Sequence, residues 1–137
     1  MSSRDSALLA FRPVVHAAPE VAHTEAEAFL HRTLRPVLKL QNDTLLALVA
    51  ADVSKRVPGF DRFAPDDARD RLGALLRSDS RLKRVLLGVV LGMLTADELA
   101  VALSHEAEIR RRIVALLAER VTSQTEAVQR LVGSGSR

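Results

Sequence analysis

A length of 137 residues fits one domain, and 47% apolar with 27% charged residues is typical of a folded chain. The absence of cysteine excludes a disulfide scaffold, cysteine catalysis and thiolate metal sites. The net charge of +3 is spread along the chain, and only 3% of the residues are aromatic. These features disfavour a basic arm for nucleic acid and a stacking surface for single-stranded bases.

Residues 1–23 are expected to form a loosely ordered N-terminal leader, because Pro13 and Pro19 interrupt any regular pattern. The apolar run over residues 7–11 is too short for a secretory signal. The longest apolar run, residues 85–94, is about half of a membrane span and indicates a buried helix. We therefore expect a cytoplasmic protein with no membrane partner.

Residues 24–132 show helical periodicity throughout, without strand alternation or hairpin turns. The first helix begins at a capping box, in which Thr24 and Glu27 satisfy each other's backbone amides. Pro36 lacks the amide that would bond to residue 32, so the helix is expected to kink or restart there. It then continues to about Arg56, where a Pro-Gly pair ends it.

Further helices are expected over residues 65–77, 80–94, 95–103 and 105–123, with an extension to residue 132 and a flexible tail over residues 133–137. Ser78-Asp79-Ser80 caps the second of these helices, and Thr95 with Glu98 forms another capping box. The predicted fold is all-α: an irregular bundle of five to six helices.

Three polar residues in the long apolar helix are candidates for a pocket. Gln41 falls on the stripe of leucines that faces inward, followed by Asn42, and Asp52 occupies a later inward position. A buried amide needs partners, so Gln41 either fixes the register between helices or lines a small polar pocket. Asp52 has the same two roles open to it, including an ion pair with an arginine from another helix.

Gly88 and Gly92 form a helix-packing notch. Each glycine inside a helix costs roughly 1 kcal/mol relative to alanine, so a close contact with another helix should offset the loss. That helix belongs either to the same chain or to a second copy. The two glycines have no phosphate-loop meaning, because no Gly-Lys-Ser/Thr follows them.

Residues 95–120 resemble a helix-turn-helix DNA reader, in which Arg110 and Arg111 would contact nucleic acid. Two features depart from that pattern: Ser104 stands where the turn usually has glycine, and Arg110 stands where the second helix needs an apolar anchor. A solvated, ion-paired helix face is the alternative.

No metal site, cofactor site or catalytic set is predicted. His23, Glu27 and His31 share a helical spacing, but two ligands on one turn do not make a site. No Gly-x-Ser-x-Gly turn or convergent nucleophile and base is present in the sequence.

Two segments, residues 33–43 (TLRPVLKLQND) and residues 87–95 (LGVVLGMLT), resemble a small all-helical bacterial family of the Bacteroidetes type. The resemblance covers most of the chain and implies a helical fold. Some members of that family are labelled glyoxalase, but the strands and the His and Glu metal ligands of glyoxalases are missing here. No catalytic residue is therefore carried over from the family.

These observations favour a non-enzymatic interaction or assembly protein whose partner is another protein or itself. The alternatives are a DNA-binding regulator that uses residues 95–120, or a small-molecule binding protein with its site at Gln41, Asn42 and Asp52. A glyoxalase-type enzyme is the least supported of these.

Overall fold

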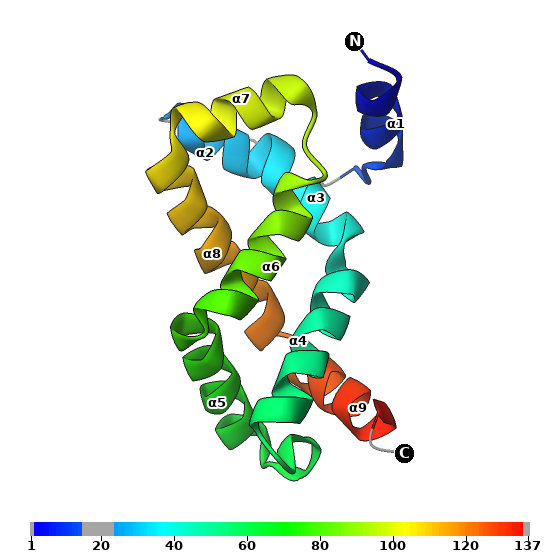
Figure 1. The fold of residues 1–137 in the computed structure, drawn as a ribbon, viewed down its shortest axis with the longest axis vertical. Coiled ribbons are helices and arrows are strands. Elements are labelled where there is room, and N and C mark those ends of the chain that lie inside the picture. The colour runs from blue at the N-terminus through cyan, green and yellow to red at the C-terminus, as the bar shows by residue number, and fades with distance from the viewer. Residues whose placement is uncertain (1, 15–23, 136–137) are drawn as a thin grey trace. The chain divides into compact units, whose positions relative to one another are not determined.

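A computed structural model describes residues 2–14 and 24–135, and within them every regular element is helical (Figure 1). The predicted all-α class is confirmed. More helices are present than the five to six expected, because the first long helix and the last one are each divided and the leader contributes a helix of its own. In the described part of the chain, no helix has the length and apolar character needed to cross a membrane.

The backbone contacts divide the chain into two compact units, and each is described by itself. The first unit is Met1–Asn42 with Leu87–Val114, and the second unit is Asp43–Leu86 with Ala115–Arg137. The helices of the first unit are α1 (Ser3–Phe11), α2 (Glu25–Phe29), α3 (Arg35–Leu40), α7 (Ala96–Ser104), the end of α6 (Ser80–Leu91) and the start of α8 (Glu106–Thr122). Its buried side chains include Phe29, Leu34, Val37, Leu94, Ile109 and Ile113.

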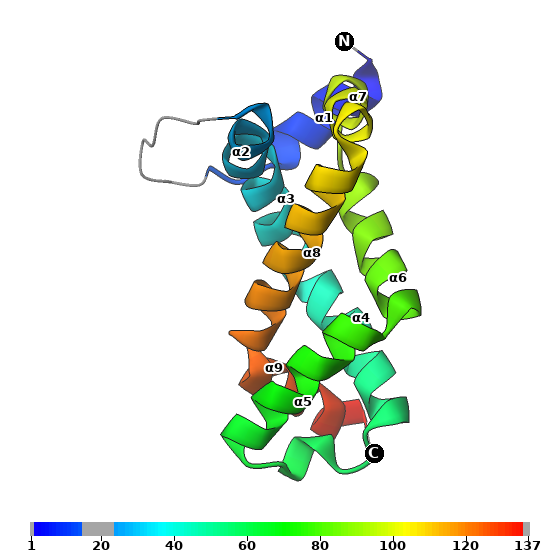
Figure 2. The same cartoon turned by 90° about the vertical axis from the view of Figure 1, so that its left-hand side faces the viewer.

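Helix α1 differs from the loosely ordered leader that the sequence predicts. Its first turn is capped by Ser2, whose hydroxyl accepts a hydrogen bond of 3.0 Å from the Asp5 amide. The helix ends at Phe11, before Pro13. Figure 2 shows α1 beside α7, where the Asp5 side chain of α1 contacts the amide of Ala96 at the start of α7. Residues 15–23 of the expected leader lie outside the described residues.

The expected interruption near Pro36 takes the form of a π-helical turn, η1 (Leu30–Leu34), between α2 and α3. Pro36 then occupies the first turn of α3, directly after the π-helical turn. A second interruption was not predicted. Gln41 leaves the helical conformation with φ −94° and ψ 9°, so α3 ends there and α4 starts at Asn42.

The second unit contains α4 (Asn42–Arg56) from residue 43 onward, the 3-10 turn η2 (Phe60–Arg62), α5 (Pro65–Ser78), α9 (Thr125–Gly135), the start of α6 and the end of α8. Gly59, with φ 75°, makes the left-handed turn that ends α4. Phe60 is fully buried, and the Gln129 amide donates to the carbonyls of Phe60 and Phe63 at 3.1 and 3.0 Å. Residues 133–135, expected in a flexible tail, continue α9.

Candidate functional site

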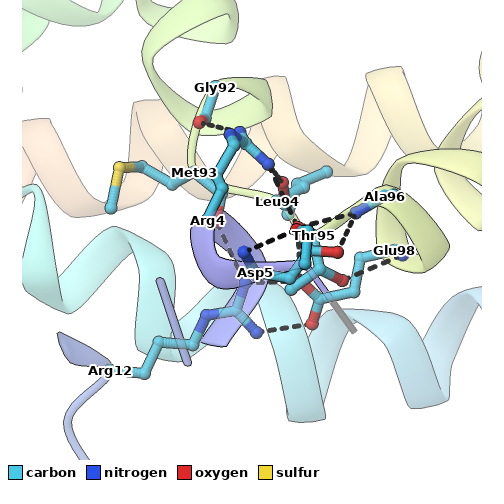
Figure 3. Close-up of polar contacts among 10 residues, drawn as sticks. Arg4, Asp5, Arg12, Gly92, Met93, Leu94, Thr95, Ala96 and Glu98 are labelled. Atoms are coloured by element: carbon cyan, nitrogen blue, oxygen red, sulfur yellow. Dashed lines mark hydrogen bonds and ion pairs between the residues drawn. The ribbon is translucent and has the colours of Figure 1, made fainter. Parts of the chain in front are cut away.

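Helix α1 is held in the first unit by charged side chains that reach the turn between α6 and α7 (Figure 3). Arg4 donates to the carbonyls of Gly92 and Leu94 at 3.0 and 3.1 Å, where the carbonyl groups at the end of α6 lack helical partners. Asp5 accepts from the Ala96 amide, at the positive end of α7, at 3.3 Å. Both charges thus complement the helix ends that they face.

A half-buried ion pair between Arg12 and Glu98 completes this attachment (Figure 3). Arg12 also donates to the Met93 carbonyl at 3.0 Å, and Glu98 accepts from the Thr95 amide at 2.9 Å within the predicted capping box. Burial by itself would raise the pKa of Glu98, but the hydrogen bonds from Arg12 and from the Thr95 amide outweigh it and lower that pKa. Glu98 is therefore a carboxylate that α1 stabilises.

The last five residues of α1, residues 7–11, are all apolar. Phe11 is 70% exposed, Val14, just beyond the helix, is 76% exposed, and Leu9 is 39% exposed. We call these three residues the α1 apolar surface. Scattered exposed apolar residues are ordinary, but three within six positions concentrate exposed apolar area at the end of α1, which is a feature of interaction sites.

An open apolar pocket of about 200 Å³ lies on the same unit, between α6, α7 and α8. Leu103, on its rim, is 58% exposed, and Arg110 contributes a guanidinium to the lining. The remaining lining residues are Leu87, Leu91, Ala102, Glu106, Ile109 and Ile113. A pocket with this lining suits one apolar or aromatic side chain.

At Gly88, the helix-packing notch is not covered by another described part of the chain. A side-chain carbon built on Gly88 would meet no atom of the described residues within 4 Å, whereas one on Gly92 would lie 3.1 Å from the Gly88 carbonyl oxygen. No helix of the first unit therefore packs closely on Gly88. The second-copy form of the packing hypothesis stays a prediction.

Arg110 and Arg111 lie on α8, and both are exposed. A single residue, His105, separates α7 from α8, whereas a helix-turn-helix motif needs a turn of three to four residues. The first turn of α8 also carries Glu106 and Glu108, which would repel DNA phosphates. The DNA-binding interpretation remains an untested alternative.

The three residues of the predicted polar pocket do not share one compact unit. Gln41 and Asn42 end the segment that belongs to the first unit, and both are half-buried. Neither residue lines the pocket between α6, α7 and α8 or the pocket that contains Asp52. Asp52 lies in the second unit and lines a pocket there.

Asp52 pairs with an arginine of its own helix, whereas an arginine from another helix was one of the partners left open by the sequence. Arg56 Nε lies 3.3 Å from Asp52 Oδ1 and 3.1 Å from Asp79 Oδ2. Asp79 caps α6, as predicted, and accepts from the Leu82 amide at 3.0 Å. One arginine therefore bridges two carboxyl groups from different helices of the second unit.

The two carboxyl groups also face each other. Their Oδ2 atoms are buried, and neither accepts a well-formed hydrogen bond from the described residues. Burial and the close contact with the Asp79 carboxyl group raise the pKa of Asp52, whereas the Leu82 amide is the main cause that lowers the pKa of Asp79. A single proton on Asp52, shared with Asp79, would satisfy both buried oxygens.

Each histidine among the described residues contacts another side chain. His31 Nδ1 accepts from Arg35 at 3.2 Å, and His105 Nε2 lies 3.0 Å from a Glu25 carboxylate oxygen. His23 is not among the described residues. Within residues 2–14 and 24–135, no group of three or more metal-binding side chains is arranged to hold an ion.

Sequence reasoning missed the α1 apolar surface and the charged attachment behind it. The available indication was the spacing of Arg4, Asp5 and Arg12, which places the three charges on one side of a helix. The usual rule, which places the apolar side inward, gives the wrong orientation for this helix.

No protein-family model, curated protein or solved structure matches the chain. The family resemblance inferred from the sequence therefore stays a prediction.

Proposed function

We propose that this chain is a non-enzymatic interaction module that associates with a second copy of itself through the first unit. The observation that carries this proposal is the α1 apolar surface, where Phe11 and Val14 are 70% and 76% exposed. Burying a large apolar side chain contributes roughly 1.5–3 kcal/mol, so a partner that covers these residues gains substantial binding energy. The cytoplasmic location expected from the sequence remains a prediction.

The orientation of α1 supports an interaction role, because its charged side is held and cannot turn outward. Arg12 and Asp5 both have partners in residues 92–98, and Asp5 is buried. Rotating the helix to bury Phe11 would break these contacts and leave Glu98 without its arginine. The contacts of Asp5 and Arg12 thus keep Phe11 exposed.

A second copy supplies a fitting receptor in the pocket between α6, α7 and α8. That pocket is apolar, open and about 200 Å³, and a phenyl ring entering it would also meet the Arg110 guanidinium. Phe11 and the pocket lie on the same unit, so each copy offers both halves of the contact. A reciprocal exchange would close a two-fold dimer, whereas a one-way exchange would extend into a filament.

The test is the mass in solution, measured by light scattering behind a sizing column over a range of concentrations. We expect the wild-type chain to reach twice its mass of 15.0 kDa or more. Phe11→Ser and Leu103→Ser should each shift the chain to monomer without unfolding it, because both side chains are exposed. Leu131→Ser is the matched control, since Leu131 is 41% exposed on α9 of the second unit.

Three results would overturn the proposal. The first is a wild-type chain that stays monomeric at all concentrations. The second is dissociation by Leu131→Ser to the same extent as by Phe11→Ser. The third is a chain that is dissociated by Gly88→Leu but not by Phe11→Ser, because the glycine notch would then be the interface.

A further inference from the structure

A second pocket, of about 300 Å³, lies within the second unit between α4 and α6. Its volume falls at the lower end of the range for small-molecule sites. It shares no residue with the α1 apolar surface or with the pocket of the first unit. Its lining residues are Leu48, Ala51, Asp52, Lys55, Arg56, Arg81, Leu82 and Val85.

The lining includes two cationic side chains that have no partner among the described residues. Lys55 and Arg81 line the pocket from different helices, and neither side chain makes a hydrogen bond or an ion pair with the rest of the described chain. Arg56, by contrast, is committed to Asp52 and Asp79. Lys55 and Arg81 are therefore the charges available to a ligand.

The total charge of the pocket is positive. Three cations, Lys55, Arg56 and Arg81, face at most two carboxylates. When Asp52 and Asp79 share one proton, the opposing charge falls to a single carboxylate. An anion is therefore the complementary ligand.

The other part of the lining is apolar. Val85 is 44% exposed although it lies in the longest apolar run, and half-buried Leu48 lies in the same lining. An inorganic anion would leave these side chains in water. An anion that carries a short hydrocarbon body would cover them.

We propose that this pocket binds a small organic anion, with its anionic head group at Lys55 and Arg81 and its apolar body on Leu48 and Val85. The inference is independent of the proposed self-association, because it rests on residues of the other unit. The head group is a carboxylate or a phosphate monoester, since both accept hydrogen bonds from Lys and Arg.

The test is calorimetric titration of the full chain with hexanoate, hexyl phosphate and inorganic phosphate. We expect at least one of the two hexyl compounds to bind at least tenfold more tightly than inorganic phosphate. The tighter of the two identifies the head group. Lys55→Gln and Arg81→Gln should each weaken that binding at least tenfold, and Val85→Ser should weaken the hexyl compound but not inorganic phosphate.

Arg84→Gln is the matched control, because Arg84 is exposed on the same helix, one turn from Arg81, and does not line the pocket. It should leave binding unchanged. The proposal is overturned when neither hexyl compound saturates the chain, or when Arg84→Gln weakens binding as much as Arg81→Gln does. The melting temperature of each variant, which we expect to match the wild type, distinguishes lost binding from lost folding.

Discussion

The facing carboxyl groups of Asp52 and Asp79 make the stability of the second unit depend on pH in a definite direction. Asp79 has a lowered pKa, so its contribution is present above the unfolded pKa and is lost as the pH falls through the folded value. Asp52 has a raised pKa, so its contribution is present at low pH and is lost as the pH rises through the folded value. The pair therefore stabilises the second unit most at a pH between the folded pKa of Asp79 and the folded pKa of Asp52.

Asp52→Asn should remove the loss of stability on the alkaline side of that window. The asparagine amide can donate permanently to Asp79 Oδ2, which is the bond that Asp52 makes only when it is protonated. The midpoint of urea unfolding at pH 4 and pH 8 tests this expectation. The variant should lose less stability than the wild type on going from pH 4 to pH 8.

The control for this experiment is Asp43→Asn, which removes an exposed carboxylate from the same helix. It should keep the pH dependence of the wild type. A wild-type profile in Asp52→Asn would mean that the two carboxyl groups do not share a proton in solution.

At the scale of single elements, α1 shows how a helix can be attached by its charges. Buried ion pairs contribute little net stability, but removing one partner leaves the other charge uncompensated. Glu98 illustrates this, because its side chain is only 19% exposed and Arg12 offsets the cost of burying it. The attachment of α1 and the ionisation of Glu98 should therefore be coupled.

Arg12→Met tests that coupling, because it keeps an unbranched apolar stem and removes the guanidinium charge. At pH 7 the variant should lose about 2 kcal/mol of unfolding free energy, since the Glu98 carboxylate loses its main partner. The lowered pKa of Glu98 contributes stability above the unfolded pKa that is lost as the pH falls through the folded value. The variant should therefore lose less stability than the wild type on acidification, as followed by urea unfolding from pH 7 to pH 3.

Arg4→Met is the companion variant for this measurement. It removes the hydrogen bonds to the Gly92 and Leu94 carbonyls but leaves the ion pair of Glu98 in place. Its acid profile should keep the wild-type slope. Equal flattening in both variants would indicate that α1 detaches as a whole and that Arg12 has no specific effect on Glu98.

The elements that the sequence predicts well are those whose boundaries are encoded by neighbouring residues. The capping box of Thr95 and Glu98, the Asp79 cap and the proline at the start of α5 all depend on contacts within a few positions. The break at Gln41 was missed because no glycine or proline marks it, and the residues around it favour helix.

The candidate sites were predicted less well, because they depend on contacts across the chain. The sequence places Asp52 at an inward position of its helix, but the proximity of Asp52 to Asp79 requires α4 and the start of α6 to meet. Phe11 was assigned to a leader, because the residues that hold α1 lie more than 80 positions away. Periodicity identifies which residues share a face but not which face turns outward.

At the scale of the whole molecule, the two compact units are linked by shared helices. Helix α6 runs through residues 86 and 87, and α8 runs through residues 114 and 115, so each crosses from one unit to the other without a break. Unfolding one unit would leave half of each helix without its packing, and short isolated helices are marginal in water. We therefore expect the units to unfold together.

Differential scanning calorimetry of two matched variants tests this expectation. Val37 in the first unit and Val53 in the second are both fully buried, so replacing either with alanine removes equivalent core contacts at a cost of about 2 kcal/mol. Each variant should lower one common transition, with the calorimetric enthalpy equal to the van't Hoff enthalpy. Two transitions, of which Val37→Ala lowers one and Val53→Ala the other, would show instead that the shared helices break at the boundary and that each unit is stable by itself.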